Sequence, residues 1–176
     1  MIEDSVSFGG GTYLVLLGLL TASRGMDFLS TWLATPNLAL EGNPIARWLG
    51  WRWGAAVNAA ACLGLALWPF PAIVLITTSV LVAARNLQSV WLMRALGEMG
   101  YRSWMASRLA ETPRGLYLSC LLAQAGLTAS VGVALMWFSD EDLLSCGIGM
   151  GIVTYSVAVV VFTLLSVRRV WRAAEN

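Results

Sequence analysis

Apolar residues run along this chain in long stretches that charged residues rarely interrupt. Three of these stretches are GTYLVLLGLL, AIVLITTSVLVAA and YSVAVVVFTLL. A bilayer core about 30 Å thick is crossed by roughly 20 helical residues, because each residue of an α-helix rises about 1.5 Å. We interpret the runs of about this length as five membrane-spanning helices. They cover residues 12–33, 44–68, 72–96, 113–138 and 143–167.

Turn and capping signals separate these runs. Asn43 before Pro44 predicts an N-cap followed by proline at the first helical position, where a missing N–H is tolerated. Thr112 before Pro113 repeats the signal ahead of the fourth helix. The PFP sequence at 69–71 predicts a turn between the second and third helices, because proline interrupts a continuing helix.

Further signals mark a helix end and a helix start. Gly97 is expected to cap the C-terminus of the third helix, where glycine is the preferred residue. Ser139, followed by Asp142 three residues later, resembles a capping box that opens the fifth helix.

A short amphipathic helix is expected at 100–111, between the third and fourth helices. Its apolar stripe repeats every four residues, while the charged side chains lie off that stripe; the stripe consists of Tyr101, Met105 and Leu109. Such a helix suits the membrane interface. Packing on the bundle as an ordinary loop helix fits equally well, so both interpretations stay open.

The composition agrees with lipid as the main solvent. Hydrophobic residues make up 58% of the chain, charged residues only 12%, and the mean hydropathy is +0.71, which is far from the values of soluble proteins. The N-terminal segment begins acidic and lacks a basic region, so no removable signal peptide is expected. The sequence therefore predicts an all-α integral membrane bundle that forms one transmembrane domain over residues 1–176.

Arginine sorting predicts which way the bundle faces. With the N-terminus outside and the C-terminus inside, nine of the 11 basic residues fall on the cytoplasmic side: Arg47, Arg52, Arg94, Arg102, Arg108, Arg114, Arg168, Arg169 and Arg172. Acidic residues mark the outer side: Glu3, Asp4, Asp140, Glu141 and Asp142. Trp171 and the other tryptophans fall near the predicted interfaces. The cytoplasmic (inner) membrane is the expected location.

Charged and amide side chains at mid-membrane depth form the candidate site. A charge there costs about 2.5–3.5 kcal/mol on insertion scales, so each needs a partner or a purpose. Arg24 and Asp27 lie halfway along the first helix and share a face, and Arg85 reaches the same Asp27 if the first and third helices are neighbours. The adjoining amides are Asn86 and Asn58.

Two interpretations of this set stay open. In the first, Asp27 bridges both arginines and the amides complete a satisfied polar core that fixes helix register. In the second, the surplus arginine forms a cationic pocket, open to the cytoplasm, for the phosphate or carboxylate of a lipid or small anion. Glu41 could supply the missing negative charge, or simply face the cytoplasm ahead of the cap formed by Asn43. Gly42 is expected to allow a sharp turn there.

The segment from Asp27 to Arg47 carries a recognisable arrangement. Asp27 and Thr31 lie one turn apart in the first helix, and E-x-N-P, from Glu41 to Pro44, opens the second. This arrangement resembles a family of small prokaryotic polytopic membrane proteins of undefined function. The resemblance implies a helical hairpin within a compact bundle and carries no reaction with it. Arg24 and the Arg85–Asn86 pair are not part of the family pattern.

The sequence favours a non-catalytic membrane protein, either a subunit or a scaffold of a membrane assembly. The alternative is a carrier or enzyme that handles a lipid or small anion. Histidine is absent and no G-x-S-x-G element occurs, so no catalytic residue is identified. The three cysteines lack CxxC spacing, so no metal and no cofactor are expected. Expected partners are membrane lipids and either a second copy or another membrane protein; nucleic-acid binding has no support.

Overall fold

The computed structural model describes residues 5–140 and 142–175, with side chains placed up to residue 168. Within this part the chain forms helices and short connections and no strand, which confirms the expected all-helical class. The predictions for Glu3, Asp4, Glu141 and the side chains of Arg169, Trp171 and Arg172 lie outside the described part. The helices are α1 (Gly11–Ala34), α2 (Pro44–Leu65), α3 (Pro69–Glu111), α4 (Arg114–Trp137) and α5 (Leu143–Glu175).

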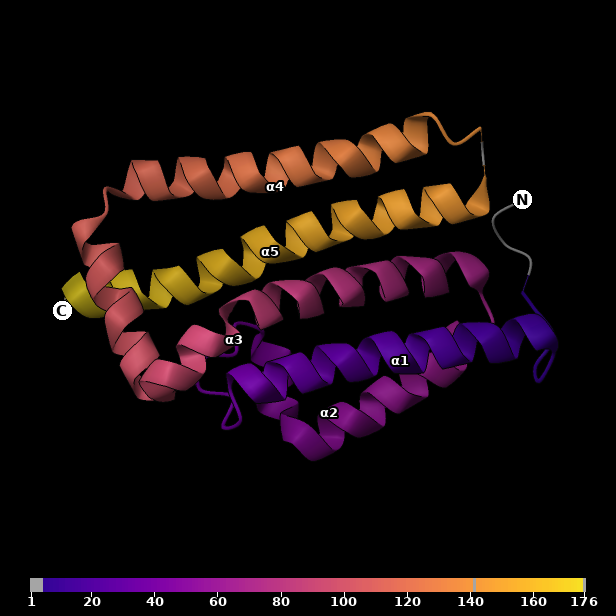
Figure 1. The fold of residues 1–176 in the computed structure, drawn as a ribbon, viewed down its shortest axis with the longest axis horizontal. Helices are drawn as coiled ribbons and strands as arrows, with labels where there is room; N and C mark the ends of the chain where they lie inside the picture. The colour runs from indigo at the N-terminus through magenta and orange to yellow at the C-terminus, as the bar shows by residue number, and fades with distance from the viewer. Residues whose placement is uncertain (1–4, 141, 176) are drawn as a thin grey trace.

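Successive helices run in opposite directions along the long axis of the molecule (Figure 1). Helices α1, α3 and α5 all end at the same end of the bundle, which we call the C-terminal end. Helix α5 packs between α4 and α3, α3 packs on α1, and α2 packs against both α1 and α3. Helix α5 therefore separates α3 from α4 along most of their length (Figure 1).

Four of the described helices are long and apolar enough to cross a membrane: α1, α3, α4 and α5 up to Arg168. Of the five predicted spans, the second lies in α2, which does not meet these criteria of length and hydropathy. Gly50 has a φ of 64°, which breaks α2 after its first two turns, and Arg47 and Arg52 flank the break. The straight part from Trp51 to Leu65 is about 22 Å long at 1.5 Å per residue, shorter than a bilayer core of about 30 Å.

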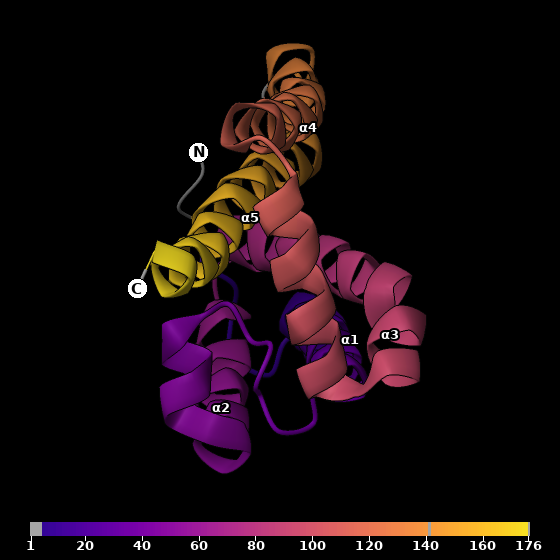
Figure 2. The same ribbon diagram turned by 90° about the vertical axis from the view of Figure 1, so that its left-hand side faces the viewer.

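Helix α3 contains both the third predicted span and the predicted amphipathic helix. Gly97 has a φ of 69°, a left-handed conformation that favours glycine, and it breaks the helix where a cap was expected. The part before Gly97 is the membrane-spanning part. Residues 98–111, which we call the cross segment, pass over the C-terminal end of the bundle toward α4 (Figure 2). Leu109 is only 4% exposed, so the apolar stripe packs on the bundle.

Several helix boundaries differ from the predicted ones. The PFP sequence at 69–71 is not a separate turn but forms the start of α3, because prolines fit a first turn whose N–H groups lack partners anyway. Asp142 caps α5 itself, since its Oδ2 accepts a 2.8 Å hydrogen bond from the Ser145 N–H, whereas Ser139 bonds back to Met136. Thr112 donates to the Arg108 carbonyl and so closes α3 rather than capping α4.

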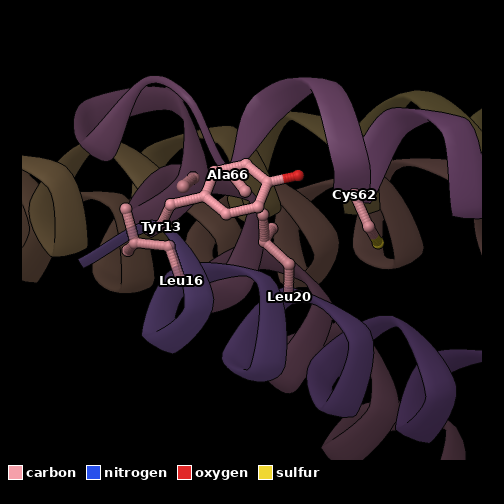
Figure 3. Close-up of a cluster of buried hydrophobic side chains, with 6 residues drawn as sticks. Tyr13, Leu16, Leu20, Cys62 and Ala66 are labelled. Atoms are coloured by element: carbon pink, nitrogen blue, oxygen red, sulfur yellow. The ribbon is translucent and has the colours of Figure 1, made fainter. Parts of the chain in front are cut away.

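The most buried apolar cluster joins the N-terminal half of α1 to the end of α2 (Figure 3). The Tyr13 hydroxyl donates a 3.2 Å hydrogen bond to the Leu63 carbonyl. Few side chains are fully buried, and many large apolar residues face outward on every helix. A surface of this kind matches a protein solvated by lipid rather than by water.

Glycines allow close helix packing between α3, α4 and α5. A Cβ on Gly132 would lie 2.5 Å from the Gly149 carbonyl oxygen, so the backbones of α4 and α5 nearly touch. Gly147 and Gly151 face Ile73 and Thr77 of α3 in the same way. Helix α2 also carries small residues at spacing four, but these are exposed: Ala55, Ala56, Ala59 and Ala60.

Candidate functional site

Arg24 is the centre of a closed polar network between α1, α2 and α3. Its Nη1 donates to Asp27 Oδ2 at 2.7 Å and to Ser79 Oγ at 3.2 Å, and its Nε donates to Asn58 Oδ1 at 2.6 Å. The side chains of Arg24 and Asp27 are only 23% and 15% exposed. The predicted ion pair and the Asn58 contribution are both present. Sequence reasoning missed Ser79, although it lies seven residues before Asn86 and therefore on the same face of α3.

Asn58 and Asn86 complete hydrogen bonds on either side of this network. The Asn58 amide donates to the Gly54 carbonyl at 2.7 Å, within α2. The Asn86 amide donates to the hydroxyls of Ser30 and Thr31 at 3.2 Å each, which ties α3 to α1. These contacts match the interpretation of a satisfied polar core, since every bond joins neighbouring helices or turns.

Arg85 does not join Asp27, which corrects the expected three-residue cluster. Adjacent residues of an α-helix point about 100° apart, so Asn86 faces α1 while Arg85 faces away from it. Arg85 lines a cavity of about 760 Å³ between α3, α4 and α5, which is open on one side. Among the described residues, no hydrogen bond or ion pair in the structure uses its guanidinium group.

The cavity beside Arg85, which we call the Arg85 groove, combines polar and apolar walls. Its polar side chains come from three helices and are Gln88, Ser89, Gln124 and Tyr155. The apolar wall includes Leu81, Leu92 and Trp91, and Trp91 is 70% exposed. Gln124 and Tyr155 lie near mid-membrane depth in α4 and α5. Gln88 and Ser89 follow Arg85 by three and four residues, so they lie on the same face of α3.

Two tyrosines lie within range of the Arg85 charge, Tyr101 in the cross segment and Tyr117 in α4. The positive charge of Arg85 acts on the hydroxyls of both Tyr101 and Tyr117. Burial raises the pKa of Tyr101, Tyr117 raises it further, and Arg85 opposes both effects. The Tyr101 hydroxyl is therefore a neutral hydrogen-bond donor at any physiological pH.

The loop between α1 and α2 contributes Glu41, Gly42 and Asn43. Glu41 accepts a 2.7 Å hydrogen bond from the Asn43 N–H, and the Asn43 side chain accepts one from Ile45, which confirms the predicted N-cap. Glu41 is also close enough to Asp27 for their charges to interact, so it adds negative charge beside Asp27 and not beside Arg85. Gly42 has no positive φ, so the expected sharp turn is not what requires glycine there. A Cβ added at this position would lie 3.3 Å from the Phe162 carbonyl oxygen of α5, which favours a residue without a side chain.

Glu98 is a functional candidate that sequence reasoning missed. Its carboxylate accepts three hydrogen bonds from the end of α1 and the following loop: from Thr35 Oγ1 at 2.8 Å, from the Asn37 N–H at 2.9 Å and from the Asn37 amide at 3.1 Å. The sequence signal that could have identified it is its position directly after Gly97, the predicted end of a helix. Burial raises the pKa of Glu98, but these hydrogen bonds and the nearby Arg94 outweigh that effect and lower it.

The chemistry available at the two sites differs. The Arg24 network has its charges paired and its hydrogen bonds used, whereas the Arg85 groove offers a free planar cation with neutral donors around it. Guanidinium binds phosphate and carboxylate through paired hydrogen bonds. Within the described residues, no group of three or more histidine, cysteine or acidic side chains is arranged to hold a metal ion. Comparisons with protein-family models, curated proteins and solved structures give no match.

Proposed function

We propose that this chain is a multi-pass protein of the cytoplasmic (inner) membrane that binds an anionic amphiphile in the Arg85 groove. The observation that carries the proposal is the Arg85 guanidinium, which lines an open cavity of about 760 Å³ and takes part in no hydrogen bond or ion pair among the described residues. The ligand class is a lipid whose head bears a phosphate or a carboxylate.

Electrostatics supports an anion at this position. An uncompensated charge at mid-membrane costs about 2.5–3.5 kcal/mol, and an anionic head would offset that cost by pairing with Arg85. The amides of Gln88 and Gln124 and the hydroxyl of Tyr155 are neutral donors in the same cavity. The exposed ring of Trp91 offers an apolar surface for the chains of the amphiphile.

Binding fits this groove better than catalysis does. Asp27 is the acid nearest in depth, but it is bonded to Arg24 on the α1 side of α3. No carboxylate or histidine lines the groove, so it contains no general base of the usual kinds. We therefore propose a non-catalytic role, such as holding, presenting or sensing the amphiphile.

The proposed orientation has the N-terminus outside and the C-terminus in the cytoplasm. It is supported by the arginines at the C-terminal end of the bundle and by the alternating helix directions (Figure 1). Helix α2 would then make a fifth, short crossing. Cysteines introduced at Ile45 and Trp68 should react with an impermeant maleimide from opposite sides of the membrane. Labelling of both from one side would show that α2 does not cross.

Ligand-dependent thermal stability in detergent tests the binding proposal. Dioleoylphosphatidylglycerol should raise the Tm of the wild type by roughly 5–10 °C at a hundredfold excess over Kd, and dioleoylphosphatidylcholine should not. Arg85→Gln should abolish this shift and Arg85→Lys should weaken it. Arg94→Gln is the matched control, because Arg94 lies on the same helix but stacks over the Trp32 ring, 5.7 Å from its centroid.

The other outcomes separate the anion sources. If oleate raises the Tm as much as phosphatidylglycerol does, a carboxylate head binds as well as a phosphate head. A shift with inorganic phosphate alone would replace the lipid by a small anion. Equal lipid-dependent shifts in the wild type and in Arg85→Gln would contradict the proposal.

A role as a subunit or scaffold of a membrane assembly is the second candidate, and the closed Arg24 network favours it. A satisfied network between α1, α2 and α3 fixes helix register without needing a ligand. The alanine faces of α2 are also free to meet a second copy or another membrane protein. This candidate predicts a stable oligomer or a co-purifying partner in mild detergent, and a monodisperse monomer would contradict it.

A further inference from the structure

The cross segment is attached to the rest of the bundle at defined points. At its start, Gly97 provides a left-handed break between the membrane-spanning part of α3 and residues 98–111. At its far end, Thr112 and Pro113 lead directly into α4. The cross segment therefore bridges the two helices that flank the Arg85 groove (Figure 2). A change of angle at Gly97 would move the whole segment relative to the groove.

The cross segment brings one side chain within range of the Arg85 charge. Tyr101 belongs to its inward-facing stripe, and the charge of Arg85 acts on the Tyr101 hydroxyl. The outward-facing side carries Arg108 and Glu111, which form an exposed ion pair at 2.7 Å. Because residues 98–111 run from α3 to α4 across the C-terminal end of the bundle (Figure 2), the segment lies over the end of the groove nearest the predicted cytoplasmic side, with its polar face outward.

One side chain fixes the angle of this segment. Glu98, the first residue after the break, binds Thr35 and Asn37 through three hydrogen bonds, two of them shorter than 3.0 Å. Thr35 is itself 4% exposed, and its hydroxyl also accepts from the Leu40 N–H at 3.1 Å. The loop after α1 is therefore an ordered anchor. Hydrogen bonds to an ionised carboxylate are stronger than neutral ones.

From these contacts we propose that Glu98 is a latch that holds the cross segment as a lid over the cytoplasmic end of the Arg85 groove. With the latch closed, the groove is open toward the lipid but covered on the side of the aqueous phase. Releasing Glu98 from Thr35 and Asn37 lets the segment turn about Gly97 and admits water and soluble anions to Arg85. This inference rests on the proposed function, since it assigns regulation to the same groove.

The test measures how quickly water-soluble reagent reaches the groove. The variant Gln88→Cys, in a background with Cys62→Ala, Cys120→Ser and Cys146→Ser, places one thiol on the groove wall. Inside-out vesicles are treated with an impermeant fluorescein maleimide, and the labelling rate is recorded. Adding Glu98→Gln or Thr35→Ala should raise that rate about tenfold, the effect of losing roughly one charge-assisted hydrogen bond.

Matched variants keep the result specific. Glu111→Gln removes a carboxylate from the other end of the same segment, outside the latch, and should leave the rate unchanged. A thiol at Arg102, exposed on the outer face of the segment, should label at the same rate with or without Glu98→Gln. Because a folding defect would also expose the thiol, all variants are compared by size-exclusion elution and Tm.

The outcomes distinguish the lid from the ligand. Equal labelling of Gln88→Cys with and without Glu98→Gln, in folded protein, would overturn the lid. Suppose that Glu98→Gln speeds the labelling of Gln88→Cys, while Arg85→Gln keeps the full lipid-dependent increase in Tm. This result would support the lid and contradict the proposed ligand. Faster labelling only in variants that also elute as aggregates would overturn the lid, because the latch would then be holding the fold alone.

Discussion

Arg24 and Arg85 each lie about halfway along a membrane-spanning helix, yet their surroundings are opposite. Arg24 is paired with Asp27 on its own helix and bonded to Asn58 and Ser79 on two others. Arg85 has no such partner among the described residues and faces a cavity. Since both charges cost energy at this depth, the difference supports a structural role for Arg24 and the binding role that we propose for Arg85.

Removing the carboxylate of Asp27 should destabilise the protein strongly. Asp27→Ala leaves Arg24 buried without its counter-charge, which typically costs about 3–5 kcal/mol for a buried pair. Thermal unfolding in detergent should show a large fall in Tm, and Arg24→Met combined with Asp27→Leu should recover much of it. The control is Glu111→Ala, because the Arg108–Glu111 pair is about 60% exposed on both sides and is expected to contribute under about 1 kcal/mol. Equal effects of Asp27→Ala and Glu111→Ala would contradict the network.

The Glu98 latch should respond to acid. The pKa of Glu98 lies below its usual value of 4.5 in the folded protein, so its contribution to stability is fully present above that value and is lost as the pH falls through the lower, folded pKa. The difference in Tm between wild type and Glu98→Gln should therefore be constant near neutral pH and shrink below about pH 4.5. A difference that stays constant down to about pH 3 would contradict the latch.

The sequence predicted side-chain contacts within one helix or cap better than contacts between helices. The Arg24–Asp27 pair and the Asn43 cap follow from spacing along one chain segment, and both are present. The direction of Arg85 depends on which helices lie beside α3, and spacing carries no such information. Glu98 was missed because its partners lie more than 60 residues away in the chain.

Individual helices follow local signals with a few informative exceptions. Gly97 was expected to end a helix, and it does break α3. The PFP sequence at 69–71 was expected to be a separate turn, but it starts α3, since the same residues suit either role. The unbroken part of α2 is shorter than its apolar run because Gly50, with its positive φ, breaks the helix after the first two turns. Hydropathy alone could not locate that break.

The contact between α4 and α5 depends on glycine. Gly132→Ala places a methyl group 2.5 Å from the Gly149 carbonyl oxygen, so the helices must separate. We expect a cost of about 1–3 kcal/mol, the usual range for overpacking, seen as a lower Tm. Gly126→Ala on the same helix is the control, because no atom lies within 4 Å of its added Cβ and alanine favours helix. A Tm for Gly132→Ala equal to that for Gly126→Ala would contradict this packing.

In the whole molecule the spatial order of the helices differs from their order along the chain, and α1, α2 and α3 contact one another beside α5 and α4. Helix α5 lies between α3 and α4 (Figure 1). The two helices that the cross segment joins therefore do not pack directly on each other, and the groove lies between them. The sequence predicted the helices but not this order, because lipid-facing apolar surfaces give no signal of which neighbours they meet. The groove, and the separation of Arg85 from Asp27, are consequences of the order.

Native mass spectrometry of the purified protein tests the central claim most directly, because it weighs the bound amphiphile itself. The protein is extracted in mild detergent, and the lipids released on activation are identified. We expect one retained anionic lipid on the wild type and on Arg94→Gln, and its loss from Arg85→Gln. The same anionic lipid retained at equal occupancy by Arg85→Gln, or only zwitterionic lipid on the wild type, would rule out an anionic amphiphile bound at Arg85.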